Sequence, residues 1–392
     1  EEGTFQHTIM AFWEYVLLLE ICYKILEKDR EQHKRDHTLY EPYRALADLY
    51  HADGYETEGD FSERMSSLME KISTEYRAKH GKQTNVRLNA SNLTEMLYCH
   101  DVRDLSKQVI EYMNRKEVCW LLFDNIDKGW PTSGLEHEDL LIIRALIDAT
   151  KKIERQFGKS NVVVNTILFL RNDVYELLVK ETSDRGKEAS VLLDWTDPDL
   201  LRELIRLRIV SNNINGESSF NSLWPKICVS HYSGEDSSQY LIDRSLMRPR
   251  FLLNLINQCK SFAINLNHDR ILEEDIEKGL KAYSTDLLTD IGYEIHDVEN
   301  NIDDVLYAFI GSRSIIKKDE IFSVLREFGV DDKFFERIFD LLLWYGFIGL
   351  NISGETKYIY DLNYSMQLIT GIIKKKRDVE YQINPAFWPA LM

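Results

Sequence analysis

Two runs of apolar and β-branched residues, separated by one amphipathic helix, constrain the fold of this chain more than any other feature. The first run, "VCWLLF", covers 118–123, and the second, "NVVVNTILFLRND", covers 161–173. Between them, 136–157 carries one apolar helical stripe, formed by Ile142, Leu146, Ala149, Ile153 and Phe157. Continuous apolar runs of this length are typical of strands covered on both faces of a parallel sheet. The order strand, helix, strand therefore predicts an α/β fold.

Both runs end in charged residues. Asp124 and Asp127 follow the first run, and Arg171 and Asp173 follow the second. In open parallel sheets ligands bind outside the carboxyl ends of the strands, so we expect these charged groups to face one site. A simpler interpretation is that "DNID" is a strand-ending turn, because Asp and Asn favour turns, and that Arg171 forms a surface pair with Asp173.

Most of the remaining chain before residue 300 has helical periodicity. Its apolar residues recur at spacings of three and four, which predicts helices at 9–26, 40–50, 61–76, 101–115, 173–211, 247–266 and 272–290. The segment "HADGYETEGD" (51–60) is predicted to be a loop, and the acidic stretch "HDVENNIDD" (296–304) a linker.

The pattern changes after residue 302. Three short helices are predicted at 302–310, 317–328 and 331–345, followed by a hairpin over 347–362 that turns at Ser353-Gly354. Three helices closed by a β-hairpin form the winged-helix arrangement. The tail "INPAFWPALM" (383–392) is apolar and is predicted to dock on this chain or on a partner.

The third of these helices would be the recognition helix of a DNA-binding winged helix. Its predicted exposed positions are Asp331, Asp332, Lys333, Glu336, Arg337 and Asp340. Four carboxylates there would repel phosphates, so protein contact or autoinhibition is favoured over DNA reading, although DNA binding stays an alternative. The basic run 374–377 could touch a nucleic-acid backbone, but such a run is usually a solvated helix end.

Composition narrows the class of protein. The net charge of −17 opposes general affinity for nucleic acid. Five cysteines occur without a CxxC pair, which argues against a disulfide framework and a zinc site and favours a reducing cytoplasm. No apolar run approaches the roughly 20 residues that span a bilayer, and no signal pattern is seen, so we expect a cytoplasmic protein without membrane contact.

The motifs in order resemble those of a known family. A strand ending in Asp124 with Asp127 close behind (118–127) resembles a Walker B segment, and the strand at 162–171, ending in Arg171, resembles sensor-1. The segment "RPRFLLNLIN" (248–257) resembles the sensor-2 helix of a lid, with local pairing of its arginines to acids as the alternative. The whole resembles the AAA+/STAND-type P-loop ATPases, and in domain order the origin-recognition ATPases and the winged-helix ATPases of bacterial defence loci.

The resemblance implies an α/β P-loop NTPase core, partial, with a parallel sheet and many helices (1–232), an α-helical lid (233–298), and a C-terminal winged-helix domain with its tail (299–392). It also implies ATP and Mg²⁺ as cofactors. The site residues would be Asp124 for Mg²⁺, Asp127 for the attacking water, Arg171 for the γ-phosphate, and Arg248 or Arg250 from the lid for phosphate. The function implied is an ATP-dependent switch that controls homo-oligomer assembly or an effector protein, in bacterial antiviral defence.

One departure from the family is clear. No GxxxxGK[ST] loop occurs in these 392 residues, and Gly158-Lys159-Ser160 fails because Ile153 stands five positions before Gly158. Without that loop there is no cradle of backbone N–H groups for phosphates. Either the loop lies outside this sequence, or the chain is a catalytically inactive scaffold or a winged-helix DNA-binding regulator.

Overall fold

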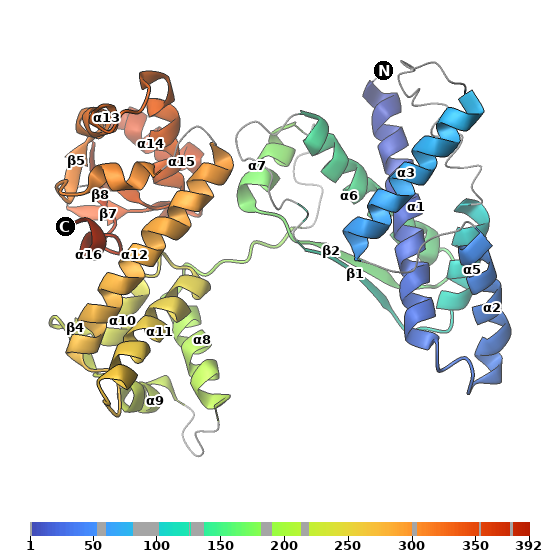
Figure 1. Ribbon diagram of the computed structural model, residues 1–392, viewed down its shortest axis with the longest axis horizontal. Helices are drawn as coiled ribbons and strands as arrows, with labels where there is room; N and C mark the ends of the chain where they lie inside the picture. The colour runs from blue at the N-terminus through green and yellow to red at the C-terminus, as the bar shows by residue number, and fades with distance from the viewer. Residues whose placement is uncertain are drawn as a thin grey trace. The chain divides into compact units, whose positions relative to one another are not determined.

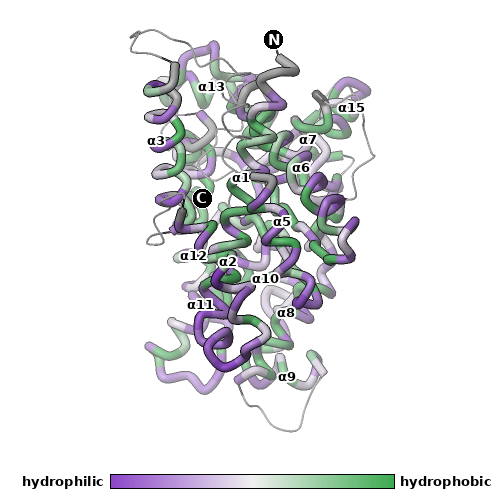
Figure 2. Tube along the Cα trace, turned by 90° about the vertical axis from the view of Figure 1, so that its right-hand side faces the viewer, coloured by the Kyte–Doolittle hydropathy of each residue, from purple (hydrophilic) through white to green (hydrophobic). Residues whose placement is uncertain are grey.

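The computed structural model shows two compact units, 1–186 and 187–392 (Figure 1). It describes residues 2–52, 60–80, 102–124, 126, 137–181, 190–212, 219–299, 304–352, 354–376 and 379–392. Hydrophobic and hydrophilic positions alternate along most helices, as expected for helices that bury one side (Figure 2). None of the helices in these ranges has an apolar stretch long enough to cross a membrane.

The first unit is helical apart from one pair of strands. Its helices are α1 (Glu2–Asp29), α2 (His37–Ala52), α3 (Phe61–His80), α5 (Val102–Met113), α6 (His137–Gly158) and α7 (Asn172–Glu181), and its strands are β1 (Cys119–Phe123) and β2 (Val164–Leu168). The helices predicted from periodicity up to residue 157 are present, each somewhat longer or shorter at its ends. The helix predicted over 173–211 is wrong as one element, because α7 ends at Glu181 and residues 190–197 are not helical. β1 and β2 pair in parallel with α6 between them, as the two apolar runs predict.

The core of this unit forms around α1. Along α1, buried side chains such as Tyr15, Leu18 and Cys22 join residues of α2, α3, α5 and α6 in one hydrophobic cluster. Burial of this helix on several sides explains why its sequence is apolar almost throughout.

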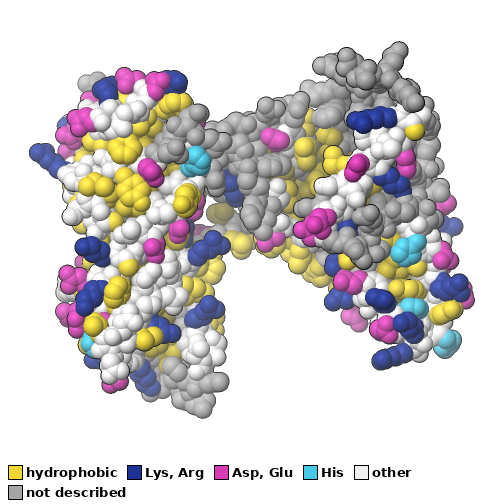
Figure 3. Space-filling model, viewed as in Figure 1, with side chains coloured by type: hydrophobic (Ala, Val, Ile, Leu, Met, Phe, Trp, Pro, Cys, Tyr) yellow, Lys and Arg dark blue, Asp and Glu magenta, His cyan; other side chains and the backbone are white. Residues whose placement is uncertain are grey.

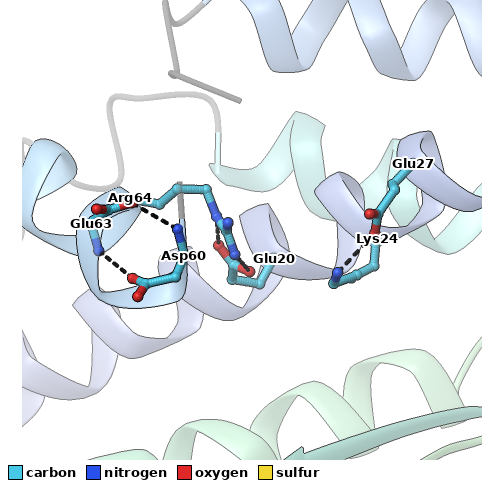
Figure 4. A network of polar contacts seen from close by, with 6 residues as sticks. All are labelled: Glu20, Lys24, Glu27, Asp60, Glu63 and Arg64. Carbon is cyan, nitrogen blue, oxygen red and sulfur yellow. Dashed lines mark hydrogen bonds and ion pairs between the residues drawn. The ribbon is translucent and has the colours of Figure 1, made fainter. Parts of the chain in front are cut away.

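Polar contacts fix the packing of α1 against its neighbours. Arg64 of α3 donates two hydrogen bonds to the Glu20 carboxylate, at 2.8 and 2.6 Å, and Asp60 and Glu63 cap the start of α3 reciprocally (Figure 4). Buried Glu14 of α1 pairs with Lys152 of α6. A buried charge with a partner on another helix specifies how the two helices align, because an unpaired one would be costly.

The second unit begins with helices and ends with a four-stranded sheet. Its helices are α8 (Pro198–Val210), α9 (Phe220–Ile227), α10 (Ser237–Asp243), α11 (Pro249–Asn265), α12 (Glu273–Val298), α13 (Lys318–Glu327), α14 (Phe335–Trp344), α15 (Met366–Lys375) and α16 (Trp388–Leu391). Short 3₁₀ helices are η1 (Val305–Phe309), η2 (Asp332–Phe334) and η3 (Ile359–Leu362), and the strands are β3 (His231–Tyr232), β4 (Glu235–Asp236), β5 (Ile315–Lys317), β6 (Ile348–Ile352), β7 (Glu355–Lys357) and β8 (Glu380–Ile383).

The C-terminal sheet has the order β5-β8-β6-β7. The hairpin β6–β7 is antiparallel and turns where the sequence predicts, with Gly354 at a φ of 89° that favours glycine. η1, α13 and α14 occupy the three predicted helical segments, so the elements of a winged helix are present in order. That this part is a winged-helix domain stays a prediction.

The apolar tail docks on its own chain, one of the two alternatives for 383–392. β8 inserts between β5 and β6, and the tail that follows buries Ala386, Phe387 and Leu391 in the main cluster of the unit. The side chain of buried Asn384 donates to the Gly346 carbonyl and accepts from the Ala386 N–H, which fixes the turn after the strand.

One hydrophobic cluster runs through the whole second unit, from α8 to α16. The sequence assigned residues up to 232 to the core, whereas Leu201, Ile205 and Trp224 of α8 and α9 pack with the helices of the assigned lid. α12 also continues as helix to Val298, into the stretch expected to be a linker.

Candidate functional site

The carboxyl edge of the β1–β2 pair gathers two of the predicted site residues. The register aligns Phe123 with Leu168, and the Phe169 N–H donates to the Phe123 carbonyl at 2.9 Å, so the ladder continues to the strand ends. Asp124 is exposed and comes directly after β1. Arg171 is half-buried and comes directly before α7. The two residues therefore leave the same edge of the sheet from adjacent strands.

The second predicted acid, Asp127, lies outside the described residues. Ile126, which lies between Asp124 and Asp127 in the sequence, is half-buried and packs against both hydrophobic clusters of the first unit. This anchors the chain shortly after Asp124.

The two faces of the sheet differ sharply. One face, with Cys119, Leu121, Phe123, Val164 and Leu168, packs into the cluster around α1. The opposite face exposes a large apolar side chain at nearly every position: Val118, Trp120, Leu122, Val163, Ile167 and Phe169, each 38% to 62% exposed. We call these six residues the open face; Asp124 continues their alternation at the carboxyl end.

The open face departs from the prediction that both faces are covered. The apolar composition of the runs is that of a fully buried parallel strand, and parallel sheets are normally covered by helices on both sides. The apolar composition of the two runs therefore predicts a layer of structure over the open face, and the described residues do not form such a layer. A contiguous apolar surface of this kind marks a contact surface.

The two lid arginines, Arg248 and Arg250, lie in the second unit. Arg248 directly precedes α11, and its Nη1 donates to both carboxylate oxygens of Glu294 on α12, at 3.0 and 3.1 Å. Burial by itself would lower the pKa of Arg248, but the Glu294 carboxylate and Tyr364 raise it overall, so the guanidinium stays charged. Arg250 is exposed two residues further along.

The sequence did not reveal that Glu294 is the hydrogen-bond partner of Arg248. Glu294 stands 46 residues after Arg248. Because this contact depends on how separate helices pack, no spacing rule in the sequence could have found it.

Other common chemistries find no support in the described part of the chain. There, no three His, Cys, Asp or Glu side chains come together in a way that could hold a metal ion. This does not bear on Mg²⁺, which keeps most of its waters and takes few protein ligands. Burial raises the pKa of three thiols to about 12, which keeps them protonated and unreactive: Cys22, Cys228 and Cys259.

The described residues on the face shown in Figure 3 carry charges of both signs rather than a basic surface. Acidic and basic side chains are interspersed over both units on the face in view (Figure 3). On the predicted recognition helix, Asp340 is exposed, and the exposed acids Glu336 and Asp332 pair with Lys318 and Arg326 at 2.7 and 3.0 Å. These pairs occupy basic side chains that would otherwise be available for phosphates.

Comparison with known proteins gives partial matches. Residues 199–292 match a family model described as the FunZ-associated C-terminal helical domain, which corresponds to α8 through most of α12. The chain is 22% identical over 285 residues to the putative transposon gamma-delta 80.3 kDa protein of Escherichia coli K12, a match that covers 72% of this chain and 39% of that protein. This chain therefore spans about two fifths of the length of that relative.

A second relative is shorter. The allergen Alt a 2 of Alternaria alternata is 25% identical over 162 residues, which covers 41% of this chain and 83% of the allergen. No solved structure matches the chain.

Proposed function

We propose that this chain is part of an ATP-binding and ATP-hydrolysing switch of the P-loop type, which controls assembly or the activation of a partner. The observation that carries the proposal is the common edge of β1 and β2, from which Asp124 and Arg171 emerge on adjacent parallel strands. Ligands of α/β proteins bind at this edge.

Each predicted residue has a role in this proposal. Asp124 holds the water shell of Mg²⁺, which when bound would neutralise phosphate charge, and Asp127 orients the attacking water. Arg171 contacts the γ-phosphate. Arg248 or Arg250 contributes a second cation from the start of α11, where the helix dipole also favours an anion.

The proposal requires further polypeptide. A phosphate cradle of the form GxxxxGK[ST] does not occur in the 392 residues, so it must come from outside them. The open face supports this requirement, because a parallel sheet in a complete α/β core has helices on both sides. Polypeptide that supplies the loop would then also cover the open face, whose side chains are 38% to 62% exposed in the described part of the chain.

The relative encoded by transposon gamma-delta suggests where such a switch acts. A related sequence in a mobile genetic element is compatible with an ATPase that serves mobile DNA or defends a bacterium against it. We favour the defence role, with a homo-oligomer or an effector protein as the partner.

The test uses the natural full-length protein, including any segment beyond these residues. We expect Mg²⁺-dependent ATP turnover that falls about 100-fold or more in Asp124→Asn, because removing one electrostatic contact of a transition state costs on that order. Asp104→Asn is the matched control, since Asp104 is exposed in the first turn of α5, outside β1 and β2. Equal turnover in Asp124→Asn and Asp104→Asn would remove Asp124 from the metal site.

The second candidate is a non-catalytic scaffold. It is favoured by the engagement of Arg248 with Glu294, which leaves no cation at that position for phosphate unless the pair opens. The DNA-binding version of this candidate is disfavoured by the exposed acids of the predicted recognition helix. A titration of duplex DNA binding against salt concentration tests the DNA-binding version, and absence of binding at low salt rejects it. A separate measurement of ATP binding tests the scaffold, and absence of ATP binding in the full-length protein favours it.

A further inference from the structure

A hollow of about 360 Å³ lies at the C-terminal end of α13. The last turns of α13 form one wall, and η1 with the residues directly after it forms the other. Four of the residues that line the hollow are apolar: Ala308, Ile310, Val324 and Phe328. Ile310 and Phe328 are 61% and 45% exposed. Large apolar side chains exposed around one hollow mark a contact surface.

The face of α13 that leads to the hollow is acidic. Exposed Glu320 and Glu327 lie seven residues apart on it, with half-buried Val324 between them. Glu327 has no basic partner in the described part of the chain, and the two basic side chains of α13, Lys318 and Arg326, pair with acids outside α13. The carbonyl end of the helix adds negative potential beside Glu327. This face therefore suits a partner that carries positive charge.

The helix α15 has the complementary character. Leu368 and Lys375 lie seven residues apart on one face, and Leu368 is 52% exposed. Gly371 lies between them, and a Cβ there would meet nothing within 4 Å, so a second helix can approach closely. Lys374 and Lys375 are exposed at the end of α15, and neither has an acidic partner among the described residues. Both α13 and α15 are 10 residues long.

The two faces do not meet within one molecule. α13 and α15 lie on different sides of α14 in Figure 1, and they are also well apart in the view of Figure 2. Both helices belong to the same compact unit, and buried side chains of each are part of its hydrophobic cluster. An α15 that reaches α13 must therefore come from a second molecule.

We propose that α15 of one copy of this chain docks antiparallel on α13 of a second copy, with Leu368 in the hollow. Lys375 then lies against Glu320, and the start of α15 lies beside Glu327. We call this pairing the α13–α15 contact. The inference deepens the proposed function, on which it rests for the expectation that the chain assembles with itself, and it names the two surfaces that would meet.

Spacing along the two helices favours the antiparallel alignment. Seven residues of α-helix span about 10.5 Å, so a Leu368 side chain in the hollow places Lys375 two turns back along α13, level with Glu320. The positive, N-terminal end of α15 then lies at the negative, C-terminal end of α13. A parallel alignment with Leu368 in the hollow would carry Lys375 beyond the end of α13.

The apolar side chain and the charges have different roles in the contact. Burial of Leu368 supplies most of the affinity, because side chains anchored in a pocket dominate the binding energy of interfaces. Exposed ion pairs contribute little free energy, but they select the orientation and the partner. A contact between two different surfaces builds a ring or a filament, unless two copies dock on each other reciprocally and close a dimer.

The experiment measures self-association of the natural full-length protein by sedimentation over a range of concentrations, without nucleotide. We expect reversible association that weakens about tenfold or more in Leu368→Asp. Lys375→Glu should weaken it several-fold, because it places a carboxylate against Glu320. Lys260→Glu is the matched control, since Lys260 is exposed on α11 and undergoes the same change of charge.

A double-mutant cycle tests whether Lys375 and Glu320 face each other. Glu320→Gln removes the charge but keeps an oxygen for the hydrogen bond that Glu320 accepts from the Lys317 N–H at 2.9 Å, so α13 keeps its cap. In this background Lys375→Glu should weaken association by a clearly smaller factor than in the wild-type protein, because the repulsion is gone. Equal factors in the two backgrounds would show that the residues do not meet, and the proposed alignment would be wrong.

Three results would overturn the α13–α15 contact itself. A wild-type protein that stays monomeric at all concentrations has no such contact, and neither has one whose association is unchanged by Leu368→Asp. If Lys375→Glu lowers the binding of duplex DNA at low salt but leaves self-association unchanged, the basic end of α15 serves nucleic acid instead. The nucleotide site is judged separately by Mg²⁺-dependent ATP turnover, in which Leu368 and Lys375 have no assigned role, so either proposal can fail without the other.

Discussion

Gly279 offers a sharp test of how closely α11 and α12 approach. The two helices lie side by side, and Gly279 faces α11 at their crossing (Figure 1). A Cβ at Gly279 would lie 2.6 Å from the Sγ of Cys259 and 2.7 Å from its Cα and its backbone N. Carbon atoms in contact need about 3.5–4.0 Å, so Gly279→Ala would force the helices apart by about 1 Å.

Two opposing effects set the change in the free energy of unfolding caused by Gly279→Ala. Alanine is better than glycine in a helix interior by about 1 kcal/mol. Overpacking a well-filled core costs about 1–3 kcal/mol, and the upper end applies where backbone atoms must move. The affected core includes fully buried Leu255 and Cys259. We therefore expect Gly279→Ala to reduce the free energy of unfolding by about 1–2 kcal/mol.

Urea unfolding followed by tryptophan fluorescence measures this change, since buried Trp224 belongs to the same hydrophobic cluster. Gly292→Ala on the same helix is the control: a Cβ there meets nothing within 4 Å, so we expect stabilisation by about 0.5–1 kcal/mol. Adding Cys259→Ala should not rescue Gly279→Ala, because the Cα and N of residue 259 remain. Stabilisation by Gly279→Ala equal to that by Gly292→Ala would refute the close crossing.

Three further predictions follow from burial and exposure. Glu14→Ala should lower the free energy of unfolding by about 2 kcal/mol, because it leaves the partly buried Lys152 without its carboxylate; thermal unfolding checks this, and an unchanged midpoint contradicts it. Stability should fall as pH rises from 8 to 10, since unfolded thiols lose their protons near pH 9 whereas folded thiols with a pKa of about 12 keep them. At pH 10 the loss is about 1 kcal/mol for each of Cys22, Cys228 and Cys259, and urea midpoints of single alanine variants should show a shallower pH slope. Trp120→Glu should change stability by less than about 0.5 kcal/mol, because this side chain is 55% exposed, but it should reduce binding of a hydrophobic dye to the open face; undiminished dye binding would show that the dye binds elsewhere.

Patterns within short segments of the sequence predicted much of the fold. Periodicity located α6, and the apolar runs located β1 and β2, because each signal arises from residues within one or two turns of each other. Gly354 marked the turn of the β6–β7 hairpin for the same reason. The sequence did not predict the strand β8, because "EYQI" becomes a strand only by pairing between β5 and β6.

The residues of the candidate site likewise include some that the sequence could place and some that only the tertiary structure places. Asp124 and Arg171 could be placed at one edge from sequence, because parallel pairing brings the ends of successive strands together. The ion pair between Arg248 and Glu294 could not be predicted, because the two residues are 46 positions apart and meet only through helix packing.

By itself, the sequence determined the positions of α6, β1, β2 and the β6–β7 hairpin, and that no loop of the GxxxxGK[ST] form occurs in the 392 residues, since both are properties of neighbouring residues. The tertiary structure decided which face of the β1–β2 pair is covered, where the tail docks and which carboxylate holds Arg248. These depend on contacts between distant segments, whose free energy comes from shape and burial and leaves no periodic trace along the chain.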